Sequence, residues 1–80
     1  MIALRNVHPK HVMEWFKANS APETIRSQPH LQQWTGKGWI MKLRYEVGVV
    51  HFNLEIEFKD GELEHAFSSR CNSHDWPRYA

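Results

Sequence analysis

Apolar and polar residues alternate in two consecutive segments of the second half of the chain. The segment 39–46 places Trp39, Met41, Leu43 and Tyr45 at odd positions, and the segment 50–58 carries its apolar residues at even positions. This alternation is typical of strands with one buried face. Turn signals at 47–48 and at Asp60-Gly61 separate these segments from a third expected strand over 62–69. The pattern predicts a three-stranded antiparallel meander with 50–58 in the middle.

The first half of the chain carries helical spacing instead. Pro9 suits the first position of a helix, with His8 as its N-cap, and a helix is expected from about Pro9 to Asn19. A capping-box pattern beginning at Ser20 predicts a second, short helix through Arg26 or Ser27. The segment 30–34 is compatible with one more helical turn.

The expected fold class is therefore α+β, with one or two N-terminal helices packed on the meander. Residues 2–5 also alternate, so a fourth strand at one edge of the sheet stays open. The core is expected where the apolar faces of helix and sheet converge. Its predicted members are Trp15, Phe16, Leu43, Phe52, Leu54, Ile56 and Phe67.

Length and composition predict one domain over residues 1–80, with 71–80 as an extended C-terminal tail. Eighty residues can bury one hydrophobic core and no second one. The single cysteine, Cys71, excludes an internal disulfide, and the first residues lack the long apolar stretch of a signal peptide or membrane span. We expect a cytoplasmic protein with no membrane partner.

The formal net charge of +1 hides an uneven distribution. Residues 1–38 carry five lysine or arginine residues against two acidic ones, and residues 39–80 carry five against seven. The outer face of the sheet is expected to combine Lys42, Arg44 and Arg70 with four glutamates, which would repel phosphate. Nucleic-acid binding is therefore an alternative and not the favoured function. The residues that would carry it join basic and aromatic groups, and they are Arg26, His30, Trp34 and Lys37.

Two pairs of residues have the spacing of metal ligands. They are His8-x-x-His11 and Cys71-x-x-His74, which together would supply one thiolate and three imidazoles to zinc. Such a site requires both ends of the chain to meet, and His8 is already explained as an N-cap. We therefore expect no metal and no cofactor, with a small zinc-binding domain as a second alternative.

The chain contains no motif that predicts catalysis. The segment 36–38 lacks the spacing of a phosphate-binding loop, and no nucleophile sits in a recognisable elbow or triad pattern. The sequence therefore favours a non-enzymatic protein.

The end of the chain carries residue types that are enriched at protein interfaces. Trp76, Arg78 and Tyr79 follow the third expected strand, which ends in small residues. We expect a protein partner, or a second copy of the chain, to add a strand along 62–69 and to contact this tail. The predicted partner-binding residues are Ala66, Ser68, Arg70, Trp76, Arg78 and Tyr79. Closure of the core by Trp76 is the alternative role for that residue.

The favoured function is a small protein-binding module, an adaptor or inhibitor that acts on a larger intracellular partner. Accessory proteins of phages and mobile elements offer an analogy for such short domains.

Overall fold

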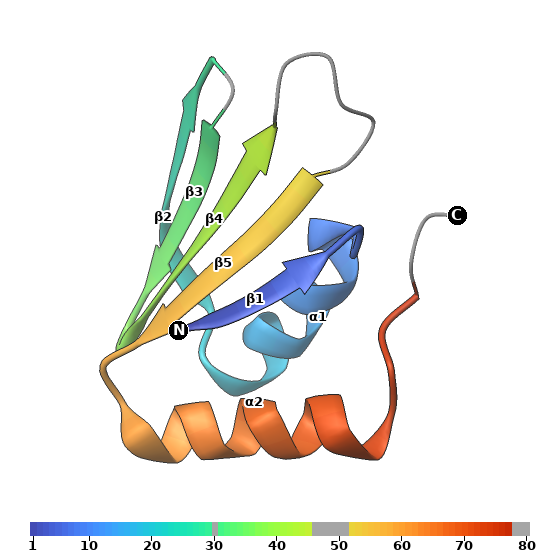
Figure 1. The fold of residues 1–80 in the computed structure, drawn as a ribbon. Coiled ribbons are helices and arrows are strands. Elements are labelled where there is room, and N and C mark those ends of the chain that lie inside the picture. The colour runs from blue at the N-terminus through green and yellow to red at the C-terminus, as the bar shows by residue number, and fades with distance from the viewer. Residues whose placement is uncertain (30, 46–51, 78–80) are drawn as a thin grey trace.

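The computed structural model describes residues 1–29, 31–45 and 52–77 (Figure 1). Within these ranges the chain forms two helices and one five-stranded antiparallel sheet, so the α+β class is confirmed. In chain order the elements are β1 (Ile2–Arg5), α1 (Pro9–Asn19), β2 (Pro22–Gln28), β3 (Leu31–Gly36), β4 (Trp39–Tyr45), β5 (Phe52–Phe58) and α2 (Gly61–Ser73). The strands lie in the order β1-β5-β4-β3-β2.

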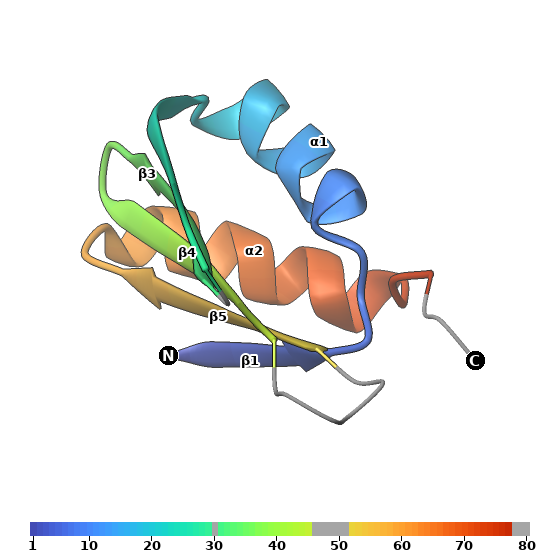
Figure 2. The ribbon, with the colours of Figure 1, turned by 90° about the horizontal axis from the view of Figure 1, so that it is seen from above.

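Both helices cover the same face of the sheet (Figure 2). Phe16 of α1 stacks on Trp39 of β4, with ring centroids 3.8 Å apart and ring planes 14° apart. Phe67 of α2 packs against Phe58 of β5 and also against Phe16. The core therefore lies between the helix layer and one face of the sheet, and neither α1 nor α2 covers the opposite face.

The first helix has the predicted bounds and the predicted cap. The Nδ1 atom of His8 accepts a hydrogen bond from the backbone N–H of Lys10 at 3.1 Å, and Pro9 opens the helix. Proline has no N–H group, and an N–H at the first position of a helix has no acceptor within the helix. Pro9 therefore costs the helix no hydrogen bond at this position. Residues 2–5 form β1, so the fourth strand that the sequence left open exists and pairs with β5.

The predicted second helix is wrong, because residues 22–28 form β2 and residues 31–36 form β3. The two strands pair with each other, with Ile25 opposite Trp34, and β3 continues the sheet through β4. A local capping pattern around Ser20 is outweighed by the hydrogen bonds and the packing that the sheet supplies to this segment. The sheet therefore has two strands that the sequence pattern did not predict.

The predicted third strand of the meander is also wrong, because residues 61–73 form α2. The side chain of Asp60 accepts hydrogen bonds from the backbone N–H groups of Glu62 and Leu63, at 3.0 and 3.3 Å. Asp60 thus caps a helix instead of opening a hairpin. Leu63, Phe67 and Cys71 follow four residues apart and all face the core, which is helical spacing. The expected extended tail therefore begins after residue 73 and not at residue 71.

The predicted core is largely confirmed, but its register is corrected. Phe16, Leu43, Leu54, Ile56 and Phe67 are buried, and Trp15 is half-buried against the same core. A two-residue turn at 47–48 would place residue 52 opposite Leu43, whereas Leu43 pairs with Leu54. The expected turn itself lies outside the described residues. The side chain of Phe52 is likewise outside the description.

The described residues contain no helix that is long and apolar enough to cross a membrane.

Candidate binding edge and groove

Strand β2 forms one edge of the sheet and is the most exposed of the described strands. It pairs only with β3, and six of its seven residues are exposed. Ile25, in the middle of the strand, is 62% exposed. An exposed edge strand offers unpaired backbone groups to another chain. The structure thus presents an edge that the sequence pattern had assigned to a helix.

The direction of the backbone groups follows from the β3–β4 hairpin. Gly36 and Trp39 close a turn of two residues, and the closing pair of such a turn is hydrogen bonded. In an antiparallel sheet the N–H and C=O groups of successive residues point alternately to the two neighbouring strands. The even-numbered residues of β3 therefore direct their backbone groups toward β4, and the odd-numbered residues direct theirs toward β2.

The same alternation identifies the free groups of β2. Gln33, an odd-numbered residue of β3, pairs with Arg26, so the backbone groups of Arg26 bond to β3. The backbone groups of Ile25 and Ser27 must then point away from the sheet, into the open edge. These two residues supply the hydrogen-bonding positions for a strand added at this side.

The ends of β2 limit where another strand can pair. Pro22 opens the strand and Pro29 follows it directly, and neither has an N–H group to donate. An irregularity in pairing between Pro22 and Thr24 further disturbs the first residues of the strand. The regular open stretch is therefore short and is centred on Ile25 and Ser27.

The helix-facing side of β2 borders an apolar row of the core. Ile25 pairs with Trp34, which pairs with Met41, which pairs with Ile56. Trp34 is 7% exposed and Met41 is fully buried, so exposure rises sharply at Ile25. Ile25 thus continues this apolar row to the exposed edge of the sheet.

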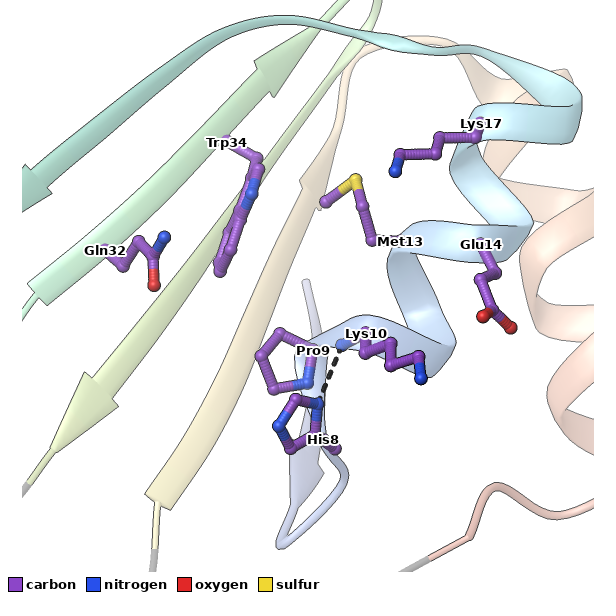
Figure 3. Close-up of a pocket in the computed structure, with 8 residues that line it drawn as sticks. All are labelled: His8, Pro9, Lys10, Met13, Glu14, Lys17, Gln32 and Trp34. Atoms are coloured by element: carbon purple, nitrogen blue, oxygen red, sulfur yellow. Dashed lines mark hydrogen bonds between the residues drawn. The ribbon is translucent and has the colours of Figure 1, made fainter.

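A groove of about 390 Å³ lies on this same side, between α1 and β3 (Figure 3). Its apolar floor is formed by Trp34 of β3 and by Met13 and Pro9 of α1, and Gln32 lies beside Trp34. Figure 3 shows Met13 and Lys17 pointing from α1 toward the sheet. The volume is near the lower end of the range of about 300–1,000 Å³ for ligand pockets, which suits one or two side chains.

The rim of the groove carries more positive than negative charge. Lys10 and Lys17 contribute two positive charges, and Glu14 contributes one negative charge. In the part of the chain that the structure describes, neither lysine forms a salt bridge, whereas Arg44 and Glu55 form one at 2.9 Å. The groove therefore suits an apolar side chain with an acidic neighbour.

The outer face of the sheet differs in charge from the expectation. The register places Arg5, Arg26, Lys42 and Arg44 there, against Glu55 and Glu57. Arg70 and Glu64 belong to α2 instead, and residue 46 lies outside the description. Among the described residues the outer face thus carries more positive than negative charge, which differs from the expected excess of glutamates.

The predicted partner-binding residues lie on α2 and after it. Ala66 is exposed and Ser68 is half-buried on that helix, so no strand edge exists there for a partner to extend. Trp76 is 5% exposed, its ring stacks near Phe67 at 5.8 Å, and the guanidinium of Arg70 lies 4.0 Å above it. Trp76 therefore closes the core, which was the alternative role. Arg78 and Tyr79 lie outside the described residues.

Among the residues predicted for nucleic-acid binding, Arg26 and Trp34 lie on opposite faces of the sheet. Arg26 projects from the outer face of β2, while Trp34 is buried on the opposite, helix-facing side. Lys37 is exposed in the β3–β4 turn, and His30 lies outside the description. Because a buried tryptophan cannot stack on a base, Trp34 is not available for the predicted contact.

Two of the four predicted zinc ligands, His8 and Cys71, accept hydrogen bonds from other groups of the chain. Besides its capping bond, His8 packs edge-on near His11, with ring centroids 6.3 Å apart. The Sγ atom of Cys71 accepts a hydrogen bond from the indole N–H of Trp76 at 3.2 Å, and His74 ends α2. Within the described ranges no three metal-binding side chains come together.

Comparison with protein families, curated proteins and solved structures yields no match for this chain. The functional argument therefore rests on the geometry of β2, of the groove and of the outer face.

Proposed function

We propose that this protein is a non-enzymatic binding module that adds an extended segment of a partner protein to the β2 edge. It would act as an adaptor or inhibitor of a larger intracellular protein. In strand addition, backbone hydrogen bonds supply affinity and the alternating side chains supply specificity. The β2 edge offers both kinds of contact, because free backbone groups and an exposed apolar side chain occur on the same strand.

The observation that carries the proposal is the position of Ile25. It is an isoleucine 62% exposed at the centre of an edge strand, beside a tryptophan that is buried. Leaving such a side chain in water forgoes much of the roughly 1.5–3 kcal/mol that full burial provides. A segment paired with β2 would cover Ile25 and bond the outward groups of Ile25 and Ser27 together.

Selection of peptides from a random library, followed by affinity measurement, tests this proposal with the full chain. The decisive variant is Ser27→Pro, which removes an outward N–H group, and Ser27→Ala, which keeps it, is the matched control. Proline is tolerated on an edge strand where its nitrogen faces solvent, so both variants should fold. Circular dichroism verifies the fold of each variant before binding is measured.

We expect Ser27→Pro to lower the affinity for the selected peptides by about tenfold or more, which corresponds to roughly 1.4 kcal/mol. Ser27→Ala should bind the peptides as tightly as the parent protein does. Equal affinities of the proline and alanine variants would show that β2 is not the binding edge.

Nucleic-acid binding is a second candidate because the outer face carries four cationic residues against two acidic ones among the described positions. A short single-stranded RNA and a DNA duplex, titrated at several salt concentrations, are the probes. Binding through this face predicts an affinity that falls steeply with salt and a salt slope that drops by about one in Lys42→Gln. Binding that is insensitive to salt would exclude this candidate.

A further inference from the structure

We infer that the segment received by β2 carries an acidic residue between two apolar residues, with the acidic side chain opposite Arg26. This inference rests on the proposed strand addition and names the chemistry of the partner. It follows from the alternation of faces along Ile25, Arg26 and Ser27. Because the pattern of an apolar, an acidic and an apolar residue is the same in both directions, it applies to parallel and to antiparallel addition.

Arg26 sets the acidic position. It lies on the outer face of β2, between Ile25 and Ser27, whose side chains point to the helix layer. In the described part of the chain Arg26 forms no salt bridge, and its neighbour across β3 is the uncharged Gln33. Opposite charges on facing positions of paired strands attract each other. A residue of the added strand that faces Arg26 is therefore matched best by aspartate or glutamate.

Ile25 and the groove set the apolar positions. The two residues that flank the acidic one point to the helix-facing side, where one of them packs directly on Ile25. The other lies beside Ser27, which pairs with Gln32 at the groove. Ser27 is small, so a longer apolar side chain can pass over it toward Trp34. The Lys10 and Lys17 ammonium groups on the rim favour an added segment of negative overall charge.

A second copy of this chain matches the edge less well. In a twofold antiparallel pairing centred on Ile25, the two Ile25 residues face each other and Arg26 faces Thr24 of the copy. Threonine offers Arg26 no negative charge. The charge of the edge therefore favours a different, acidic segment as the occupant.

Three synthetic peptides that share a threonine-rich context test the inference. Their central residues are Val-Glu-Val, Val-Lys-Val and Thr-Glu-Thr, and fluorescence anisotropy gives each dissociation constant at low and moderate salt. The protein is used as the full chain, as Arg26→Glu and as Lys42→Glu. Lys42 lies in the same outer row as Arg26 but two strands from the edge, so it is a matched charge-reversal control.

We expect the parent protein to prefer Val-Glu-Val over Val-Lys-Val by about fivefold or more, the preference being smaller at higher salt. Arg26→Glu should reverse this preference, while Lys42→Glu should keep it. Thr-Glu-Thr, which keeps the shape but loses the apolar surface, should bind about tenfold more weakly than Val-Glu-Val.

The outcomes separate this inference from the proposed function. If peptides bind in a way that Ser27→Pro abolishes, but Arg26→Glu leaves the charge preference unchanged, strand addition stands and the acidic motif is wrong. If none of the three peptides binds, the motif is wrong, and the library selection decides the proposed function separately. If the parent protein self-associates and Ser27→Pro makes it monomeric, the occupant is a second copy, which also overturns the acidic partner.

Discussion

Replacement of Gly36 by alanine provides a strong test of how the core is built. The indole of Trp39 lies directly over Gly36, so an added Cβ would overlap the indole Nε1 and Cε2 atoms and would lie 2.6 Å from Cζ2. Trp39 is 1% exposed, and its ring stacks on Phe16 at 3.8 Å. Its Nε1 donates a hydrogen bond to the carbonyl oxygen of Ser20 at 3.0 Å. The indole therefore cannot move away from the new methyl group without breaking contacts on its other side.

The contacts of Trp39 determine how much stability Gly36→Ala is expected to lose. Overpacking of a core typically costs about 1–3 kcal/mol. Loss of the hydrogen bond between Trp39 and Ser20 adds about 0.5–1.5 kcal/mol. We expect Gly36→Ala to lower the free energy of unfolding by about 2–4 kcal/mol. A domain of this length has a total stability of about 4–12 kcal/mol, so the loss is large.

Urea denaturation, followed by tryptophan fluorescence and by circular dichroism, measures this change. Gly61→Ala is the matched control, because no heavy atom lies within 4 Å of a Cβ at Gly61, the first residue of α2. That variant should gain about 0.4–1 kcal/mol through the smaller entropy of its unfolded chain. Replacement of glycine by alanine is thus expected to lower the free energy of unfolding at Gly36 and to raise it at Gly61. Should Gly36→Ala be as stable as the parent, the packing of Trp39 over Gly36 would be refuted.

Three further predictions concern the core, a cap and metal. Leu54→Ala should cost about 2–5 kcal/mol in urea denaturation, because Leu54 is fully buried in the central rows of the sheet, and an unchanged melting temperature would contradict its position. Asp60→Ala should cost about 0.5–2 kcal/mol, since it removes the acceptor for two N–H groups of α2, whereas Asp60→Asn should keep most of the stability. Elemental analysis of protein purified without chelator should find no stoichiometric zinc, and one equivalent that disappears in Cys71→Ser would contradict this.

The sequence predicted those elements whose local pattern agrees with their tertiary environment. His8 and Pro9 fix the start of α1 because capping and a preset backbone angle act within one turn. Strands β4 and β5 alternate because α1 and α2 both cover the same face of the sheet. Their faces were therefore predictable, even though the register was displaced by two residues at Leu43.

The remaining elements depend on interactions that a local pattern does not contain. Asp60 followed by glycine is compatible both with a hairpin turn and with a helix N-cap. Leu63 and Phe67 are four residues apart, which fits one face of a helix, but they also lie on one face of a strand, so the local pattern does not exclude the hairpin. For the binding edge, the missed signal is the β-branched pair Thr24-Ile25, which lies opposite Thr35 and Trp34. The signal is weak because a short edge strand carries few apolar residues. The charge of Arg26 made it a candidate from the sequence, but the outward backbone groups of Ile25 and Ser27 beside it were not predicted.

The position of β1 has a consequence for how the chain folds. Strands β2, β3, β4 and β5 are neighbours both in sequence and in the sheet, whereas Ile2 of β1 pairs with Ile56 of β5, which is far from it in sequence. Closing so long a loop costs more entropy than closing a hairpin, and contacts of this kind slow folding. We expect the four-stranded meander to form first and β1 to dock last. In native-state hydrogen exchange, β1 would then open before the strands at the centre of the sheet, and it would be the part of the sheet that pulling on the N-terminus detaches first.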